Sequence, residues 1–124
     1  MEHAAPLISD EGALRGLDRI LPVLRHIDAH KADPIGRGEL GALVGLSPVR
    51  LHALFKAVMG LAPMAYVKRV RLREAQVRLV TSGLSAAEIG QAVGYGDPFR
   101  FSRLFKAAFG LSPLRYRQQI GRMG

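Results

Sequence analysis

Apolar residues recur at intervals of three and four along the chain, which is the spacing of one face of an α-helix. The first such series is Leu14, Leu17, Leu21, Leu24 and Ile27. No segment alternates apolar and polar residues over the length of a strand. The pattern therefore predicts an all-α fold.

Capping residues and glycines divide this pattern into separate helices. Ser47, Asp97 and Ser112 each precede a proline, as in the first turn of many helices. Ser85 and Glu88 have the spacing of a capping box. Glycines able to end a helix in the left-handed conformation stand at Gly45, Gly60, Gly94 and Gly110. Together these positions predict helices over residues 12–30, 37–44, 48–59, 63–82, 86–93, 98–109 and 113–121.

A repeat of about fifty residues runs through the chain. FKAVMGLAP at 55–63 returns as FKAAFGLSP at 105–113, and the match continues upstream with an offset of forty-nine. The one-residue difference falls in a turn, where a loop absorbs an insertion. Each copy is a short helix, a turn of three or four residues and a second helix, which is the helix-turn-helix pattern. The second helices, 48–59 and 98–109, are the candidate recognition helices.

Most of the repeated residues are expected to form the core that holds each second helix on its partners. They are Leu54, Phe55, Leu61 and Tyr66 in one copy and Leu104, Phe105, Leu111 and Tyr116 in the other. Lys56 and Lys106 stand beside them on faces that cannot be buried. Contact with phosphate and simple exposure to solvent are both open for these two lysines.

Charge is distributed unevenly along a chain whose formal net charge is +8. Residues 1–47 contain five Lys or Arg and seven Asp or Glu, a balance of −2, whereas residues 48–124 contain thirteen and three, a balance of +10. A surface tuned only for solubility is one reading. Because residues 48–124 contain so few acids, the sequence favours a cationic surface that binds the phosphates of a nucleic acid.

Several classes of chemistry find no candidate residues. The chain has no cysteine, which excludes disulfides, Cys-zinc sites and thiol nucleophiles. It contains no glycine-rich phosphate loop and no paired carboxylates with a base, so no enzymatic activity and no cofactor are expected. His26 and His30 lie near Asp33, but no third strong ligand is fixed by spacing, so no metal is expected. Because the chain has neither a signal peptide nor a membrane span, we expect a cytoplasmic protein.

The segment GYGDPFRFSRLFKAAFGLSPLRYRQ, residues 94–118, resembles the signature of the DNA-binding domain of the AraC/XylS family of bacterial transcription regulators. The segment LGALVGLSPVRLHALFKAVMGLAPMAYVKRVRLREAQVRLV, residues 40–80, is similar to the first half of that domain. The resemblance extends over about residues 15–120. It implies a homeodomain-like fold with a linker or disordered N-terminus at 1–14, helix-turn-helix subdomains at 15–62 and 83–124, and a linking helix at 63–82.

The linking helix has a length that suits double-stranded DNA. About twenty residues of helix span roughly 30 Å, and one turn of DNA spans roughly 34 Å. The resemblance therefore implies that the two recognition helices enter successive segments of the major groove.

The resemblance also implies contact residues, carried over position by position. DNA base contacts fall at Val49, Arg50, His52, Ala53, Phe99, Arg100, Ser102 and Arg103. DNA phosphate contacts are expected from Lys56, Lys68, Arg69, Arg71, Lys106, Arg115 and Arg117.

Four of the base-contact positions differ in the kind of contact that they can make with a base. Arg103 is the strongest candidate, because a guanidinium pairs bidentately with guanine. Ala53 stands where the family frequently has arginine, and it offers only apolar contact, for instance to a thymine methyl. His52 either contacts a base or lines the groove wall. Phe99 either stacks on thymine methyls or folds back onto the core, and we favour the core.

The implied function is a sequence-specific transcription regulator or its isolated DNA-binding domain. Most relatives carry a separate ligand-sensing and dimerising domain before this region, and MEHAAPLISDEG reads like a linker. We therefore lean towards an excised domain, monomeric as a fragment and dimerising through a preceding domain if one exists. One alternative is a helical protein-interaction module that docks on RNA polymerase, with DNA secondary. Another is binding to anionic membranes or to nucleic acid of any sequence.

Overall fold

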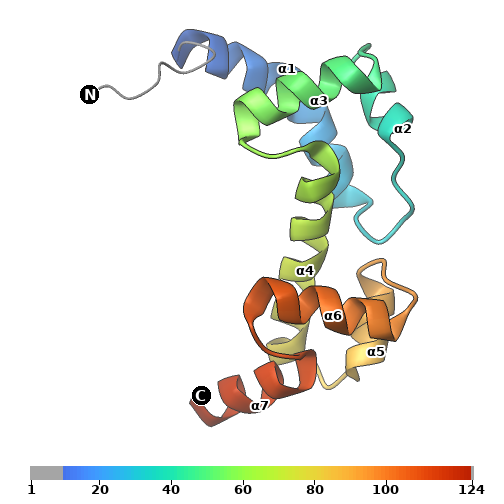
Figure 1. Cartoon of the computed structure of the whole chain (residues 1–124), viewed down its shortest axis with the longest axis vertical. Coiled ribbons are helices and arrows are strands. Elements are labelled where there is room, and N and C mark those ends of the chain that lie inside the picture. The colour runs from blue at the N-terminus through green and yellow to red at the C-terminus, as the bar shows by residue number, and fades with distance from the viewer. Residues whose placement is uncertain (1–9, 124) are drawn as a thin grey trace. The chain divides into compact units, whose positions relative to one another are not determined.

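The computed structural model describes residues 10–123, which fold into α-helices with no strand in that range (Figure 1). In chain order the helices are α1 (Asp10–Ala29), α2 (Arg37–Ala42), α3 (Pro48–Met59), α4 (Pro63–Thr81), α5 (Ala86–Ala92), α6 (Pro98–Phe109) and α7 (Pro113–Met123). The all-α prediction is confirmed. None of these described helices is long and apolar enough to cross a membrane.

The helix ends differ from the predicted ones by at most two residues. Residues 10–14, which we expected to be linker, belong to α1, and residues 1–9 of the expected linker lie outside the described part of the chain. Helix α2 ends at Ala42 because turn hydrogen bonds replace helical ones after it. The N–H groups of Val44 and Leu46 both donate to the carbonyl oxygen of Gly41, at 3.1 and 2.9 Å.

The predicted helix starts are capped as expected. Ser47 Oγ accepts from the N–H of Arg50 (3.2 Å), and Asp97 Oδ1 accepts from the N–H of Phe99 (2.9 Å). Before α5, Ser85 Oγ accepts from the N–H of Glu88 (3.1 Å), and the Glu88 carboxylate accepts from the N–H of Ser85 (2.9 Å). These bonds satisfy amides that have no partner inside the helix.

Left-handed glycines stand at the predicted positions. Gly45, Gly60, Gly94 and Gly110 have φ of 68°, 83°, 104° and 82°, and they are the positive-φ residues of the described chain. Gly60 and Gly110 end the two candidate recognition helices, and each N–H donates to the helix carbonyl four residues earlier. A side chain with a Cβ is strained in this conformation.

The chain divides into two compact units, which we describe separately. The first contains α1, α2 and α3 and the beginning of α4 up to Val67. The second contains His30–Pro34, the rest of α4 from Lys68 onwards, and α5 to α7. In each unit a tight turn joins a short helix to a candidate recognition helix (Figure 1).

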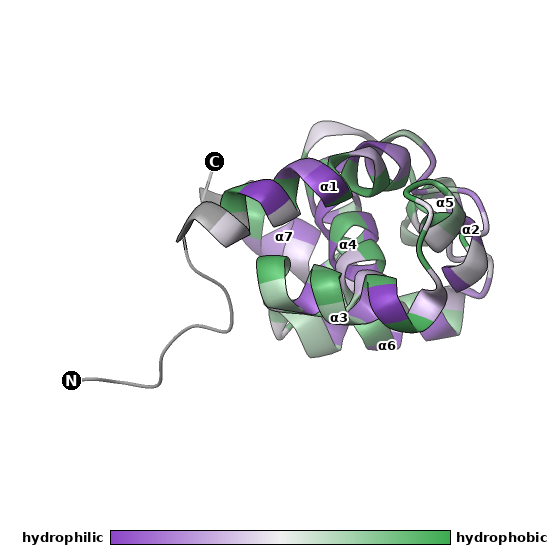
Figure 2. Ribbon diagram, turned by 90° about the horizontal axis from the view of Figure 1, so that it is seen from above, coloured by the Kyte–Doolittle hydropathy of each residue, from purple (hydrophilic) through white to green (hydrophobic). Residues whose placement is uncertain are grey.

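Each unit has its own apolar core. The buried apolar residues of the first are Ile20, Val23, Ile27, Ile35, Leu40, Leu51, Phe55 and Val67. Those of the second are Leu72, Ala75, Leu79, Ile89, Val93, Tyr95, Phe101 and Phe105. The ribbons of α3 and α6 carry hydrophobic and hydrophilic residues in alternating bands, as amphipathic helices do (Figure 2).

The repeated aromatic residues pack alike in the two cores. Phe55 and Tyr66 make an edge-to-face contact with ring centroids 5.6 Å apart, and Phe105 and Tyr116 do the same at 5.5 Å. Both phenylalanines are buried and both tyrosines are half-buried. The expectation that the repeat encodes core packing is thus confirmed for the phenylalanines.

Candidate nucleic-acid interface

The two helix-turn-helix turns are closed by the same backbone hydrogen bond. The N–H of Leu46 donates to the carbonyl oxygen of Gly41 (2.9 Å), and that of Tyr95 donates to the carbonyl oxygen of Gly90 (2.7 Å). A Cβ on Gly41 would collide with the Leu46 carbonyl oxygen, and one on Gly90 would lie 2.8 Å from the Phe101 ring. The absence of a side chain on Gly41 lets the turn backbone come close enough to form the turn, and that on Gly90 leaves room for the Phe101 ring of α6.

Helix α3 presents its predicted contact residues to solvent. The core takes Leu51 and Phe55, which lie one turn apart on the buried side of the helix. The opposite side carries the exposed residues Val49, Arg50, His52, Ala53 and Lys56. The structure thus brings all the predicted base-contact positions of this helix onto one accessible surface.

Helix α6 has the same arrangement, with Phe101 and Phe105 buried. Its exposed residues include Phe99, Arg100, Arg103 and Lys106, while Ser102 is half-buried. The expectation that Phe99 folds back onto the core is wrong, because its side chain is 77% exposed. With about 100° of rotation per residue, a helix that buries positions 101 and 105 points position 99 away from the core.

The two exposed surfaces are cationic. Neither α3 nor α6 contains an aspartate or glutamate, and each carries cationic side chains on its exposed side. The acid immediately before α6 is Asp97, whose carboxylate accepts from the N–H groups of Phe99 and Arg100. Within α6 itself no carboxylate offsets the positive charge of Arg100, Arg103 and Lys106.

Arg71 has a structural role in the second unit. Its Nε donates to the carbonyl oxygen of Lys31 (2.6 Å) and its Nη2 to that of Asp33 (2.7 Å). The guanidinium carbon also lies 5.6 Å from the centre of the Tyr95 ring. These partners engage two N–H groups of the guanidinium and give Arg71 a structural role, while its contact with phosphate stays a prediction.

Arg117 is engaged in a similar way. Its Nε donates to the carbonyl oxygen of Leu79 (2.9 Å) and its Nη2 to that of Ser82 (3.2 Å). Carbonyls at the end of a helix lack intrahelical partners, and a cation there also meets the negative end of the helix dipole. Arg117 therefore caps the end of α4, and its predicted contact with phosphate stays a prediction.

Tyr95 is a residue whose role sequence reasoning missed. Its ring stacks on Phe101 with centroids 6.0 Å apart, and the guanidinium carbon of Arg100 lies 5.8 Å from its centre. Burial raises the pKa of its hydroxyl, although nearby Arg71 and Arg100 oppose that rise. The neutral ring thus joins the turn to the start of α6 through a cation–π contact. The aromatic residue after Gly94 was the signal available in the sequence.

The remaining predicted phosphate contacts are exposed, namely Lys56, Lys68, Arg69, Lys106 and Arg115. In the second unit, Lys68, Arg69 and Arg73 line a groove of about 480 Å³ between α4 and α6. Its apolar lining comes from Leu72, Leu104, Ala107, Ala108 and Phe109. Cations at such an open position are accessible to a phosphate backbone.

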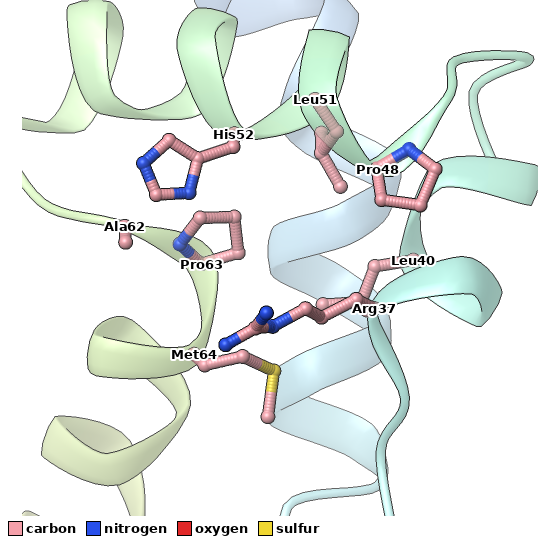
Figure 3. A pocket seen from close by; sticks show the side chains of 8 residues that line it. All are labelled: Arg37, Leu40, Pro48, Leu51, His52, Ala62, Pro63 and Met64. Atoms are coloured by element: carbon pink, nitrogen blue, oxygen red, sulfur yellow. The ribbon is translucent and has the colours of Figure 1, made fainter.

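A small pocket of about 60 Å³ lies beneath the start of α3 (Figure 3). The imidazole of His52 lies beside Pro63, and the Arg37 side chain extends from α2 toward Met64 (Figure 3). The pocket has room for about one or two water molecules and not for an organic ligand. His52 lines this pocket but is exposed at the surface of α3, so its imidazole is accessible to a partner.

The two histidines considered as metal ligands have carboxylate neighbours. His26 Nε2 lies 2.6 Å from Glu39 Oε2 in the first unit, which links α1 to α2. His30 Nδ1 lies 3.2 Å from Asp33 Oδ2 in the second unit. These contacts give both imidazoles a role in holding the chain around the α1–α2 loop.

Comparison with known proteins identifies relatives of this arrangement. A family model described as a helix-turn-helix domain matches residues 40–119. The HTH-type transcriptional regulator GlxA of Rhizobium meliloti (strain 1021) is 33% identical over 79 residues, which are 64% of this chain and 24% of that regulator. The chain thus spans about a quarter of the length of this relative.

Solved structures have a similar fold. A transcriptional regulator described as an AraC-type DNA-binding domain-containing protein from Chromobacterium violaceum has a TM-score of 0.81 and 25% identity, over 90% of this chain and 99% of that one. The DNA-binding domain of AdpA, a global transcriptional factor solved in complex with a target DNA, has a TM-score of 0.78 and 25% identity. That similarity covers 82% of this chain and 91% of the AdpA domain.

Proposed function

The chain belongs to the AraC-type helix-turn-helix family, and from this premise we propose that it is a sequence-specific, double-stranded DNA-binding transcription regulator, or the DNA-binding domain of one. The observation that carries the proposal is the duplicated surface. Two equivalent second helices, α3 and α6, each expose a cationic side that contains no acid. In this proposal they enter successive segments of the major groove, where helices of this motif read base edges.

The proposed base contacts divide into polar and apolar groups. Arg50, Arg100 and Arg103 supply guanidinium groups, of which Arg103 is assigned to guanine. His52 and Ser102 supply shorter hydrogen-bonding groups, while Val49, Ala53 and Phe99 supply apolar contact. The proposed phosphate contacts are all exposed side chains, namely Lys56, Lys68, Arg69, Lys106 and Arg115.

As such a regulator, the protein carries out no covalent chemistry and binds the chromosome in the bacterial cytoplasm. One copy of the chain carries both recognition helices, so a monomer can occupy two groove segments. DNA recognition of this kind needs no metal or cofactor at the proposed contact residues. Contact with RNA polymerase belongs to the proposal only as a consequence of binding DNA at a promoter.

Selection from a random duplex pool tests the proposal. The selected duplex and a scrambled duplex are then titrated at several salt concentrations. We expect affinity to fall steeply with salt for both, and the preference for the selected duplex to persist. Equal affinity for the two duplexes at every salt concentration would contradict sequence-specific binding. Binding to RNA polymerase without affinity for any duplex would favour a protein-interaction module instead.

A further inference from the structure

The second residue of each recognition helix is an exposed apolar side chain. Val49 on α3 is 79% exposed and Phe99 on α6 is 77% exposed. No other large apolar side chain in the described part of the chain is as exposed, the next being Leu14 at 66%. The two residues are equivalent in the repeat, fifty positions apart.

The helix starts hold these side chains in place. A proline occupies the first helical position of both α3 and α6, and Ser47 and Asp97 cap the free amides. Proline has a fixed φ, and capping removes the tendency of the first turn to fray. Val49 and Phe99 therefore stand on well-ordered backbone, turned away from the core residues two positions later.

Isolated apolar residues at a surface are ordinary and need no partner. Here the same exposure occurs at the same position in two copies whose side chains differ, and a cation is the next residue along each helix. Arg50 follows Val49, and Arg100 follows Phe99. The surface thus suits a partner that is anionic and also presents small apolar groups.

Major-groove base edges have one apolar group, the 5-methyl of thymine. Resting on the proposed function, we propose that Val49 and Phe99 bind thymine methyl groups, so that each half-site of the operator contains a thymine facing the start of its recognition helix. A 5-methylcytosine offers the same methyl and fits the same contact. Hydrogen-bonding residues further along each helix, His52 on α3 and Arg103 on α6, read the neighbouring base pairs.

Deoxyuridine tests this inference, because it lacks only the methyl group and pairs as thymine does. Each thymine of the selected duplex is replaced in turn, and the Kd of the whole chain is measured. We expect one replacement in each half-site to raise the Kd about fourfold, the equivalent of one buried methyl group. Replacement of thymines that face none of Val49, Ala53 and Phe99 is expected to leave the Kd unchanged.

The repeat supplies matched control variants. Phe99→Ala should remove the sensitivity to deoxyuridine in the α6 half-site and leave that of the α3 half-site intact. Val49→Ala should do the reverse. Because both side chains are exposed, the thermal unfolding midpoints of the two variants should equal that of the wild type.

The outcomes separate this inference from the proposed function. If the wild type prefers no duplex, the proposed function fails. If it prefers the selected duplex but no deoxyuridine replacement changes the Kd, only the reading of methyl groups is wrong. If the sensitivity persists in Phe99→Ala and Val49→Ala, another residue contacts the methyl groups and the assignment is overturned. If the variants bind DNA like the wild type but bind a protein partner more weakly, the surface is a protein-docking site.

Discussion

Phe101 packs directly against the backbone of Gly90. A Cβ built on Gly90 would lie 2.8 Å from both Cγ and Cδ2 of the Phe101 ring, closer than real Cβ contacts are found. Both residues are buried in the core of the second unit. Helices α5 and α6 therefore meet at a point that has no room for a side chain on α5. This contact sets how closely the candidate recognition helix packs on its partner.

Gly90→Ala is expected to lower the free energy of unfolding by about 1–3 kcal/mol, the usual cost of adding a methyl group to a packed core. Urea denaturation followed by circular dichroism measures it. Gly38→Ala is the matched control, because Gly38 lies in α2 with no atom within 4 Å of a Cβ. That control should be neutral or stabilising by up to about 1 kcal/mol, since alanine favours helix. Equal effects in the two variants would contradict the packing argument.

Arg71→Lys tests the structural role of the guanidinium. Lysine keeps the charge but cannot place two N–H groups on the carbonyl oxygens of Lys31 and Asp33. We expect the free energy of unfolding to fall by about 1–3 kcal/mol, the cost of losing a hydrogen bond from a charged group. Unchanged stability together with weaker DNA binding would show that Arg71 contacts phosphate and does not stabilise the fold.

Lys68→Ala is expected to weaken binding to every duplex alike. An exposed lysine that neutralises one phosphate contributes about one unit to the slope of log K against log salt concentration. That slope should therefore become shallower by about one unit, while thermal stability is unchanged. A loss of affinity confined to the selected duplex would show that Lys68 reads sequence instead.

Arg103→Ala is expected to relax the preference at one base pair. A bidentate contact between arginine and guanine discriminates against the wrong base by about 1–3 kcal/mol. Binding across a randomised duplex library measures the change. Lys106→Ala, one turn further along the same exposed side of α6, is the matched control and should weaken binding without changing the preference. Identical library profiles for Arg103→Ala and the wild type would contradict the assignment.

Glu88→Gln is expected to alter the pH dependence of folding. The backbone N–H of Ser85, and then its hydroxyl, lower the pKa of the Glu88 carboxyl from the ordinary value of 4.5. A carboxylate whose pKa is lower in the folded state stabilises that state above the ordinary pKa, and its contribution is lost as the pH falls through the folded value. Glutamine keeps a capping side chain but does not titrate in this range. The stability of Glu88→Gln should fall less steeply in acid, and parallel curves would contradict the prediction.

The predictable part of the site consists of interactions local in sequence. Ser47 and Asp97 cap amides two or three residues away, and Gly60 and Gly110 end helices through bonds to the fourth residue before them. Each such interaction forms within one helical turn, so the residues that make it stand together in the sequence. The repeat and the helical period then place the candidate contact residues of α3 and α6 on one side of each helix.

Local pattern alone does not show which apolar residues of a helix are buried. On α1, Leu14 and Leu17 fit the helical series but are exposed, while Ile20, Val23 and Ile27 are buried. The period identifies a helix, but several faces of α1 are apolar, and only a neighbouring helix selects one. Part of that selection is steric, since a Cβ on Gly16 would lie 2.6 Å from the Val58 side chain of α3.

The sequence by itself determined the helices, their ends, the duplicated helix-turn-helix and the cationic character of α3 and α6, because these depend on neighbours within a turn or on composition. The tertiary structure decided that Arg71 and Arg117 bond to carbonyl oxygens 35 to 40 residues away and that Phe99 stays outside the core. The sequence shows an arginine but does not show whether its guanidinium binds a phosphate or a backbone carbonyl. Its partner exists only once folding has brought distant helix ends and loops within hydrogen-bonding distance.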